Sequence, residues 1–321
     1  MAKVIVTGRI PVEAVNVLFA EHQVVEWNEP DPIPRDELLA RVVGADAIVA
    51  LLTEQIDSEL LEAAGPQLRV VSNVAVGFNN IDVPACTSRG IAATNTPGVL
   101  TEATADIAMS LILMTTRRLA EGERVIRHGQ SWRWGMFYML GTSIQGRQLG
   151  IIGMGQIGAA LARRAKAFGM TIAYSNRNEI SRELSAELGC VRLNLDELLA
   201  TSDVVSLHCP YSPETHHLIG SDQLAMMRED SFLINTARGP VVDEAALAKA
   251  LQAGVIQGAG LDVFEHEPDV HQDLLELDSV VLLPHLGSAT FETRSAMALL
   301  AAANTLAVLR GEPALTPING A

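Results

Sequence analysis

Three glycines, Gly153, Gly155 and Gly158, are the feature of this sequence that most constrains its fold. The apolar residues 149–152 before them predict a buried strand, and residues 157–168 after them have apolar side chains at helical spacing. In a turn of this kind the first glycine permits a tight bend, the second admits a pyrophosphate, and the third lets helix and strand pack closely. We therefore predict a Rossmann unit that binds a dinucleotide at the amino end of this helix.

The rest of the chain alternates short apolar runs with amphipathic stretches, which predicts parallel sheets covered by helices. A long helix is expected over residues 101–128 and a last amphipathic helix over residues 291–310. In the first part of the chain, helices are expected at 11–20 and 57–64, and strands at 4–6, 47–50 and 70–73. In the second part, strands are expected at 149–152, 171–174, 204–207, 232–235, 260–263 and 280–283.

A chain of 321 residues is too long for one comfortable hydrophobic core, so we expect two domains. The predicted fold class is α/β, with two doubly wound Rossmann-like domains of parallel sheets, the cofactor domain being inserted into the substrate domain. Residues 1–98 and 284–321 would form a flavodoxin-like, substrate-binding domain. Residues 99–283 would form the dinucleotide-binding Rossmann domain.

Charge and composition exclude several classes of function. With 23 Lys and Arg against 38 Asp and Glu, the net charge is −15, which disfavours nucleic acid as a partner. The most apolar stretch, residues 107–114, is much shorter than the ~20 residues of a membrane span. The three cysteines form no C-x-x-C pair, and the segment 266–271 lacks the spacing of a zinc helix. We expect a cytoplasmic protein with reduced cysteines and no metal.

The residues after the second strand of the Rossmann unit bear on the choice of cofactor. A site for NAD would place an acid there, about 20 residues after the glycines, to hold the ribose 2′-hydroxyl. This sequence has Ser175, Asn176 and Arg177 instead, and Glu179 comes too late. These side chains offer hydrogen bonds and a positive charge to a 2′-phosphate, so NADP(H) is predicted as the preferred cofactor, with NAD(H) as the alternative.

Three residues with complementary chemistry follow later strands, at the edge where an open α/β sheet binds its ligands. Arg238 follows the strand at 232–235, and His285 follows the strand at 280–283. Glu267 lies in the segment between them. A cation for an anionic substrate, a titrating imidazole and a carboxylate to orient it are what the reduction of a 2-keto acid requires.

Several separated motifs occur in an order that resembles the D-isomer-specific 2-hydroxyacid dehydrogenase family, and more narrowly its glyoxylate/hydroxypyruvate reductase branch. The resemblance covers nearly the whole chain. The motifs are residues 73–82, 101–106, 235–239 (Asn-Thr-Ala-Arg-Gly), 261–264 with Glu267-Pro268, and 284–288 (Pro-His-Leu-Gly-Ser).

The resemblance implies a role for each of these residues. Arg238 would bind the substrate carboxylate and polarise the 2-oxo group. His285 would be the general acid in reduction, and Glu267 would hydrogen-bond it and favour the imidazolium form. Val76 and Gly77 would offer backbone N–H groups to the carboxylate. The implied cofactor contacts are Thr104, Gly153, Gly155, Gln156, Ile157, Gly158, Pro210, Thr215, Thr236, Ala237, Arg238, Asp262, His285 and Gly287.

An aromatic segment, residues 131–138, contains two of the three tryptophans. Polar-flanked aromatic residues outside a regular strand favour contact with a partner. By the resemblance, this segment would belong to a homodimer interface, and Trp134 would close the substrate pocket of the other subunit. Packing beneath a loop is as good an interpretation for Trp132. Leu52 is a further predicted lining residue of the substrate pocket.

The sequence thus predicts an NADPH-dependent reductase of small 2-keto acids, with glyoxylate and hydroxypyruvate as substrates. Within the same enzyme class, 2-ketogluconate or an aryl-pyruvate is the alternative substrate. A dinucleotide-sensing binding protein, like the corepressors of the family, is the alternative from another class. From the length of the chain we do not expect the additional regulatory domain that the family's phosphoglycerate dehydrogenases often carry.

Overall fold

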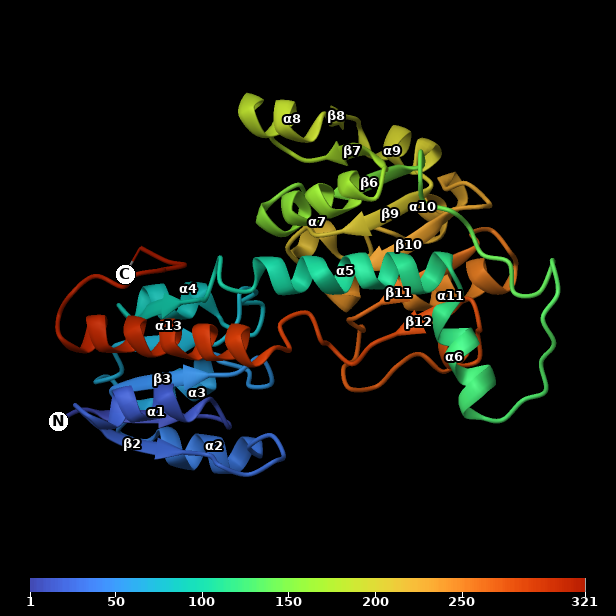
Figure 1. Ribbon diagram of the computed structural model, residues 1–321. Helices are drawn as coiled ribbons and strands as arrows, with labels where there is room; N and C mark the ends of the chain where they lie inside the picture. Colours follow the sequence, from blue (N-terminus) through green and yellow to red (C-terminus); the bar gives the residue numbers. More distant parts are fainter. Residues whose placement is uncertain (321) are drawn as a thin grey trace. The chain divides into compact units, whose positions relative to one another are not determined.

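The computed structural model describes residues 1–320 and divides into two compact units (Figure 1). Unit 1 consists of Met1–Leu100 together with the C-terminal segment from Ala289, and unit 2 consists of Thr101–Ser288. Unit 2 is therefore inserted into unit 1. The chain crosses between the units a few residues later than the predicted crossings at 98 and 284.

Unit 1 is a five-stranded parallel sheet in the order β2-β1-β3-β4-β5, the doubly wound order of flavodoxin-like folds. Strands β2 and β5 were not predicted, because they are short and β2 begins and ends on a polar residue. The strands are β1 Lys3–Val6, β2 Gln23–Glu26, β3 Ala47–Ala50, β4 Val70–Asn73 and β5 Ala92–Thr94. The helices are α1 Val12–Phe19, α2 Arg35–Val42, α3 Ser58–Ala64, α4 Val83–Ser88 and the C-terminal α13 Phe291–Leu309.

Helix α13 returns the end of the chain to unit 1, where it packs on α1, β3 and β4 (Figure 1). Its buried face joins the β-sheet core through Ala298, Ala301 and Ala302. Small side chains allow the helix to approach the sheet closely, and the hydroxyl of Thr305 donates to that of Ser72 at 2.9 Å. The predicted amphipathic helix is thus confirmed as a covering layer of the first sheet.

Unit 2 is a seven-stranded parallel sheet in the order β12-β11-β10-β9-β6-β7-β8. Its chain starts in the middle at β6 and winds to one side and then to the other, which places the switch point between β6 and β9. The strands are β6 Gln148–Ile152, β7 Thr171–Ser175, β8 Val191–Arg192, β9 Val204–Leu207, β10 Phe232–Asn235, β11 Gly258–Leu261 and β12 Val280–Leu282. The helices are α5 Thr101–Thr116, α6 Leu119–Arg127, α7 Gln156–Ala167, α8 Arg182–Leu188, α9 Leu195–Thr201, α10 Ser221–Met226, α11 Glu244–Gln252 and α12 Gln272–Leu275.

Two predicted elements of unit 2 differ in the structure. The single helix expected over residues 101–128 is two helices, α5 and α6, because Arg118 between them has a left-handed backbone with φ of 54°. Strand β11 begins two residues before the predicted 260. It includes Gly258 and Gly260, where a Cβ atom would lie 3.2 and 2.9 Å from the side chain of Thr115. These glycines therefore let α5 lie close against β11.

Within residues 1–320, no helix combines the length and the apolar character that a membrane crossing would need.

Candidate active site

The glycine turn lies at the switch point of the unit 2 sheet, directly after β6. Gly153 has φ of 96°, and a Cβ atom there would lie 2.5 Å from the backbone nitrogen of Cys209, beyond the end of β9. Only glycine fits such a crowded left-handed position. A Cβ atom on Gly158 would lie 2.6 Å from the carbonyl oxygen of Gly153, whereas Gly155 has no atom within 4 Å of its Cβ position. Gly153 and Gly158 serve packing, and the space at Gly155 is open for a ligand.

The amino end of α7 presents backbone donors to this open space. The helix begins at Gln156 with Gly155 as its N-cap, and no side chain caps it. The first N–H groups of the helix, including that of Ile157, are therefore available to an anion, and the helix dipole favours negative charge there. These observations fit the pyrophosphate of a dinucleotide.

The end of β7 brings Ser175, Asn176 and Arg177 beside the glycine turn. The Asn176 Oδ1 atom accepts the N–H of Met154 at 2.6 Å, and the Ser175 carbonyl accepts the N–H of Gly153 at 3.1 Å. Both residues thus hold the turn in shape. Arg177 is exposed, and its charge is one of the influences that lower the pKa of Glu214, after hydrogen bonds from the Ser212 hydroxyl and the Glu214 backbone.

Arg192 on β8 hydrogen-bonds to the same loop. Its Nη2 atom donates to the carbonyl oxygens of Asn176 and Arg177, at 3.0 Å each. Its Nη1 atom lies 3.2 Å from Glu179, the acid that sequence reasoning placed too late for the ribose. Sequence reasoning missed Arg192, because nothing near it in the chain signals contact with residues 176–179.

Residues expected along the cofactor have different surroundings. Thr215 is held in its turn, since its Oγ1 atom donates to the Pro210 carbonyl at 2.9 Å. Thr236 is buried, and its Oγ1 atom has no hydrogen-bond partner among residues 1–320. The Ala237 N–H donates to Asn235 Oδ1 at 3.0 Å. An unsatisfied buried hydroxyl costs free energy, so Thr236 is suited to a bound polar group.

His285 and Glu267 form a hydrogen-bonded pair. The Nδ1 atom of His285 lies 2.8 Å from Oε2 of Glu267, and the other carboxylate oxygen accepts the N–H of Phe264 at 3.0 Å. Burial would raise the pKa of Glu267, but the hydrogen bond and charge of His285 outweigh it and hold that pKa below its ordinary value. His285 has φ of 53°, an uncommon backbone conformation for a residue other than glycine.

Asp262 shapes the turn that presents His285. Its two carboxylate oxygens accept the N–H groups of Leu286 and Gly287, at 2.7 and 2.8 Å, and its carbonyl accepts the N–H of His285 at 2.9 Å. Burial raises the pKa of Asp262, against the effect of these backbone donors. Thr104 on α5 donates to the Gly287 carbonyl at 3.0 Å. Asp262 thus orients the general-acid candidate, a task that its position in the sequence did not reveal.

Arg238 stands close to this pair. Burial lowers the pKa of its guanidinium, whereas the charge of Glu267 favours the protonated form. The Arg238 carbonyl accepts from Asn235 Nδ2 at 2.9 Å. The next residue, Gly239, packs on the segment that follows β11, since a Cβ atom on Gly239 would lie 1.8 Å from the backbone carbonyl carbon of Phe264. This close backbone contact fixes the position of the segment that carries Arg238 relative to the segment that carries Glu267.

In unit 1, the predicted substrate-binding residues lie in loops at the carboxyl ends of β3 and β4. The side chain of Asn95 donates to the Val76 carbonyl at 2.8 Å, and that of Asn73 donates to the Gly77 carbonyl at 2.9 Å. The N–H groups of Val76 and Gly77 donate to no other residue of the described chain. Leu52 is half-buried in the turn after β3. The substrate contacts of Leu52, Val76 and Gly77 stay predictions.

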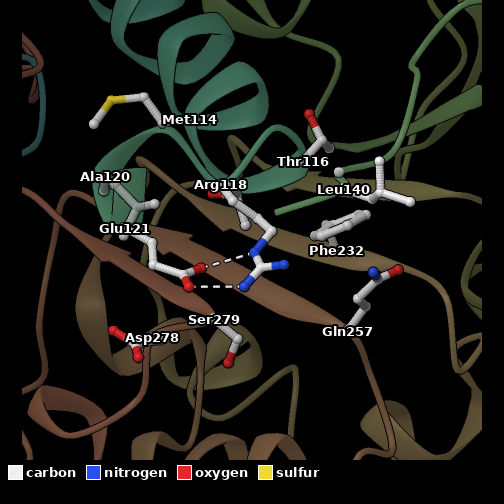
Figure 2. Close-up of a pocket in the computed structure, with 13 residues that line it drawn as sticks. Met114, Thr116, Arg118, Ala120, Glu121, Leu140, Phe232, Gln257, Asp278 and Ser279 are labelled. Atoms are coloured by element: carbon white, nitrogen blue, oxygen red, sulfur yellow. Dashed lines mark hydrogen bonds and ion pairs between the residues drawn. The ribbon is translucent and has the colours of Figure 1, made fainter. Parts of the chain in front are cut away.

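Unit 2 has a cavity of about 310 Å³ at the amino ends of its strands, whereas the glycine turn and His285 follow the carboxyl ends (Figure 2). Phe232, Gln257 and Ser279, which line it, stand at or before the amino ends of β10, β11 and β12. The Arg118 guanidinium lies in it and donates twice to the carboxylate of Glu121, at 2.7 Å each (Figure 2). A ligand in this cavity would be separated from His285 by the length of the strands, so we do not assign it to the active site.

The fold and the site together define an enzyme that depends on a dinucleotide. A guanidinium and an imidazole that bonds to a carboxylate lie at the carboxyl ends of its strands, where the cofactor binds. Comparison with known proteins gives the family. Residues 109–287 match the model of the D-isomer specific 2-hydroxyacid dehydrogenase, NAD binding domain. The chain belongs to this family, and it is an oxidoreductase that uses a nicotinamide dinucleotide.

Individual relatives match over nearly their whole lengths. The glyoxylate reductase of Pyrococcus furiosus is 48% identical over 322 residues, which cover 99% of this chain and 95% of that protein. The crystal structure of the TT0316 protein from Thermus thermophilus has a TM-score of 0.92 and 41% identity, covering 99% of this chain and all of that one. An NADPH-dependent glyoxylate/hydroxypyruvate reductase from Sinorhizobium meliloti, in complex with NADP and malonate, has a TM-score of 0.87 and 36% identity, covering 99% and 96%.

Gly155, which faces open space, and Gly158, which is packed against the Gly153 carbonyl, together give a test of the cofactor site. We expect Gly155→Ala to weaken dinucleotide binding about tenfold or more, because its methyl group would occupy the space for the phosphates, while the Tm changes by less than about 2 °C. Gly158→Ala should instead lower the free energy of unfolding by about 1–3 kcal/mol, because its Cβ atom would meet the Gly153 carbonyl. Cofactor titration and thermal unfolding measure the two effects, and unchanged cofactor affinity in Gly155→Ala would contradict the assignment.

Proposed function

We propose that this enzyme reduces glyoxylate and hydroxypyruvate to the corresponding 2-hydroxy acids, with the D configuration where C2 is chiral, and that NADPH is its preferred cofactor. The observation that carries the proposal is the hydrogen bond of 2.8 Å between His285 Nδ1 and Glu267, formed beside Arg238. The names of the relatives from Pyrococcus furiosus and Sinorhizobium meliloti support glyoxylate as a substrate, and the second also supports hydroxypyruvate and NADPH.

The proposed reaction needs a proton at the 2-oxo group and a cation for the carboxylate. Because Glu267 occupies Nδ1 of His285, the proton for the carbonyl oxygen leaves from Nε2, and Glu267 holds the ring in position for the transfer. Arg238 binds the substrate carboxylate and polarises the carbonyl. When bound, the nicotinamide supplies the hydride to C2. The products are the 2-hydroxy acid, the oxidised dinucleotide and a neutral imidazole.

The remaining anion contacts of the proposed substrate are backbone groups. The N–H groups of Val76 and Gly77 are proposed to donate to the carboxylate, because neither donates to another residue of the described chain. Leu52 is proposed to lie against the substrate side chain. A chain with a net charge of −15 repels anions at long range, so binding of the anionic substrate depends on local donors such as these.

The preference for NADPH is proposed from the loop after β7. Arg177 is exposed there, and no acid follows β7 at the position where a ribose 2′-hydroxyl would need one. Asn176 is bonded to Met154, so Ser175 and Arg177 remain as the proposed side-chain donors to a 2′-phosphate.

A homodimer is proposed from the apolar surface of the segment after α6. Within residues 132–140 the exposed fraction is 50% for Trp132, 79% for Trp134, 73% for Met136 and 88% for Phe137. Helix α6 buries none of its residues within the chain, although Leu119 and Ile126 lie on it. An apolar surface this extensive favours a protein partner. We propose that a second copy covers it and that Trp134 closes that copy's substrate pocket.

The activity is tested with NADPH and NADH on glyoxylate, hydroxypyruvate, 2-ketogluconate and phenylpyruvate. We expect the wild-type enzyme to reduce the first two fastest. His285→Ala should lower kcat by about 100- to 10,000-fold, since it removes the proton donor, and leave cofactor binding largely intact. His266→Ala, which removes an exposed imidazole from the neighbouring turn, is the matched control. No turnover of any substrate by the wild-type enzyme would refute the reductase and favour a dinucleotide sensor.

The cofactor preference is tested by Arg177→Ala. A charge-assisted hydrogen bond to a phosphate contributes about 1.5–3 kcal/mol, so we expect the KM for NADPH to rise about tenfold or more and that for NADH to change less than about twofold. Steady-state kinetics with both cofactors measure this, and Arg182→Ala, an exposed arginine of the next helix, is the control. An equal loss with both cofactors would refute the role of Arg177.

The dimer is tested by Phe137→Asp and Trp134→Ala. Light scattering should give the mass of two chains for the wild type and of one chain for Phe137→Asp, because a carboxylate is costly to bury in an apolar interface. Phe291→Asp, which alters an equally exposed phenylalanine on α13, should stay dimeric. Trp134→Ala should raise the KM for the keto acid without changing that for the cofactor. A wild-type monomer in solution would refute this proposal.

A further inference from the structure

The turn that carries Glu267 has little regular structure of its own, yet it must hold a carboxylate against His285. It runs from Glu265 to His271, between β11 and α12. Within the turn, the N–H of Asp269 donates to the carbonyl of His266 at 2.8 Å. Four of its residues, 266–269, are exposed. Its position therefore depends on how its two ends are anchored.

One buried carboxylate lies against the two ends of this turn and hydrogen-bonds the first of them. Glu244, the first residue of α11, is 4% exposed. Its Oε1 atom accepts the N–H of Glu265 at 2.6 Å. The backbone of His271 also favours the charged carboxylate, against the rise in its pKa that burial causes. Glu244 thus holds the first residue of the turn by a hydrogen bond, two residues before Glu267.

The side chain of Glu265 extends this connection in two directions. Its Oε2 atom accepts the N–H of Glu244 at 3.3 Å, and its Oε1 atom lies 2.5 Å from Nε2 of His217. His217 also donates its backbone N–H to the carbonyl of Pro240, at 2.8 Å. Pro240 follows Gly239, which packs on the backbone of Phe264 and Glu265. The segments that carry Arg238 and Glu267 are therefore linked a second time, through these side chains.

N-terminal capping of the helix does not account for a buried acid at this position. The N-cap of α11 is Asp243, whose side chain already accepts the N–H of Ala246 at 2.9 Å. Burial raises the pKa of Glu244, which shows that its charged form is costly, and the nearby Glu265 adds to the cost. A buried carboxylate of this kind is compensated by the donors around it, and here the hydrogen-bond donor is the backbone N–H of Glu265 in the turn.

We propose that Glu244 is a positioning residue for the reaction, acting with Glu265 and His217 to fix the turn from which Glu267 hydrogen-bonds His285. This inference rests on the proposed function, in which the Glu267–His285 pair moves the proton. Glu244 itself bonds to the backbone of the turn, so its effect reaches His285 through Glu267.

The central experiment compares Glu244→Gln with the wild-type enzyme. The amide has the same shape but turns an N–H₂ group toward one of the two backbone groups that favour the carboxylate, so the turn loses an anchor. We expect kcat for keto-acid reduction to fall about 10- to 100-fold, in the range that misplacement of a reacting group causes. The Kd of the dinucleotide should change less than about twofold, because the glycine turn lies elsewhere on the sheet edge.

Glu197→Gln is the matched control, because Glu197 also accepts a backbone N–H at the start of a helix, α9. It should keep wild-type kcat. His217→Asn is a second variant for the same connection, since asparagine tolerates the left-handed backbone of His217, with φ of 48°, but does not reach Glu265. We expect a smaller fall in kcat in the same direction. Wild-type kcat in both Glu244→Gln and His217→Asn would overturn the proposal.

A readout without substrate separates this inference from the proposed function. In a crystal structure of Glu244→Gln, we expect the Glu267–His285 hydrogen bond, 2.8 Å in the wild type, to be broken or divided between conformers. An unchanged pair in that structure would overturn the positioning role, whatever the enzyme reduces. A broken pair together with a wild-type enzyme that reduces none of the keto acids would refute the proposed function alone.

Discussion

The parallel register of β10, β11 and β12 is the constraint on which the active site depends. It brings the carboxyl ends of three strands to one edge, so that residues far apart in the chain follow one another across the sheet. The close packing of Gly239 on Phe264 then leaves no room for independent movement of the segments that carry Arg238 and Glu267. Backbone contacts set the placement of the charged groups, and side-chain hydrogen bonds refine it.

The fold could be predicted from the sequence wherever the periodicity of apolar residues and the positions of glycines indicated the same element. The strand before Gly153 and the helix that contains Gly158 were predicted from local pattern. The strand is a run of buried residues, and the helix has apolar side chains at helical spacing on one buried face. The break at Arg118 was not predictable, since arginine does not signal a left-handed backbone. The short β8, with both residues exposed, has no apolar pattern to recognise.

The chemistry of the site was partly legible for a similar reason. Arg238, Glu267 and His285 carry reactive groups at strand ends, where their chemical type suggests a use. Asp262, Arg192 and Glu244 act by bonding to backbone groups distant in the sequence, and no local pattern encodes such partners. Asn176 shows the converse case, since a residue read as a ligand donor holds the glycine turn through Met154.

The left-handed backbone of His285 has a consequence for how this enzyme can change over evolutionary time. At φ of 53° a branched or bulky side chain is strained, and glycine, asparagine, aspartate and histidine are the residues that accept it most readily. Of these, only histidine exchanges a proton near neutral pH. Most single substitutions that would place a different proton donor at this position would therefore lower the stability of the fold, whatever their effect on catalysis.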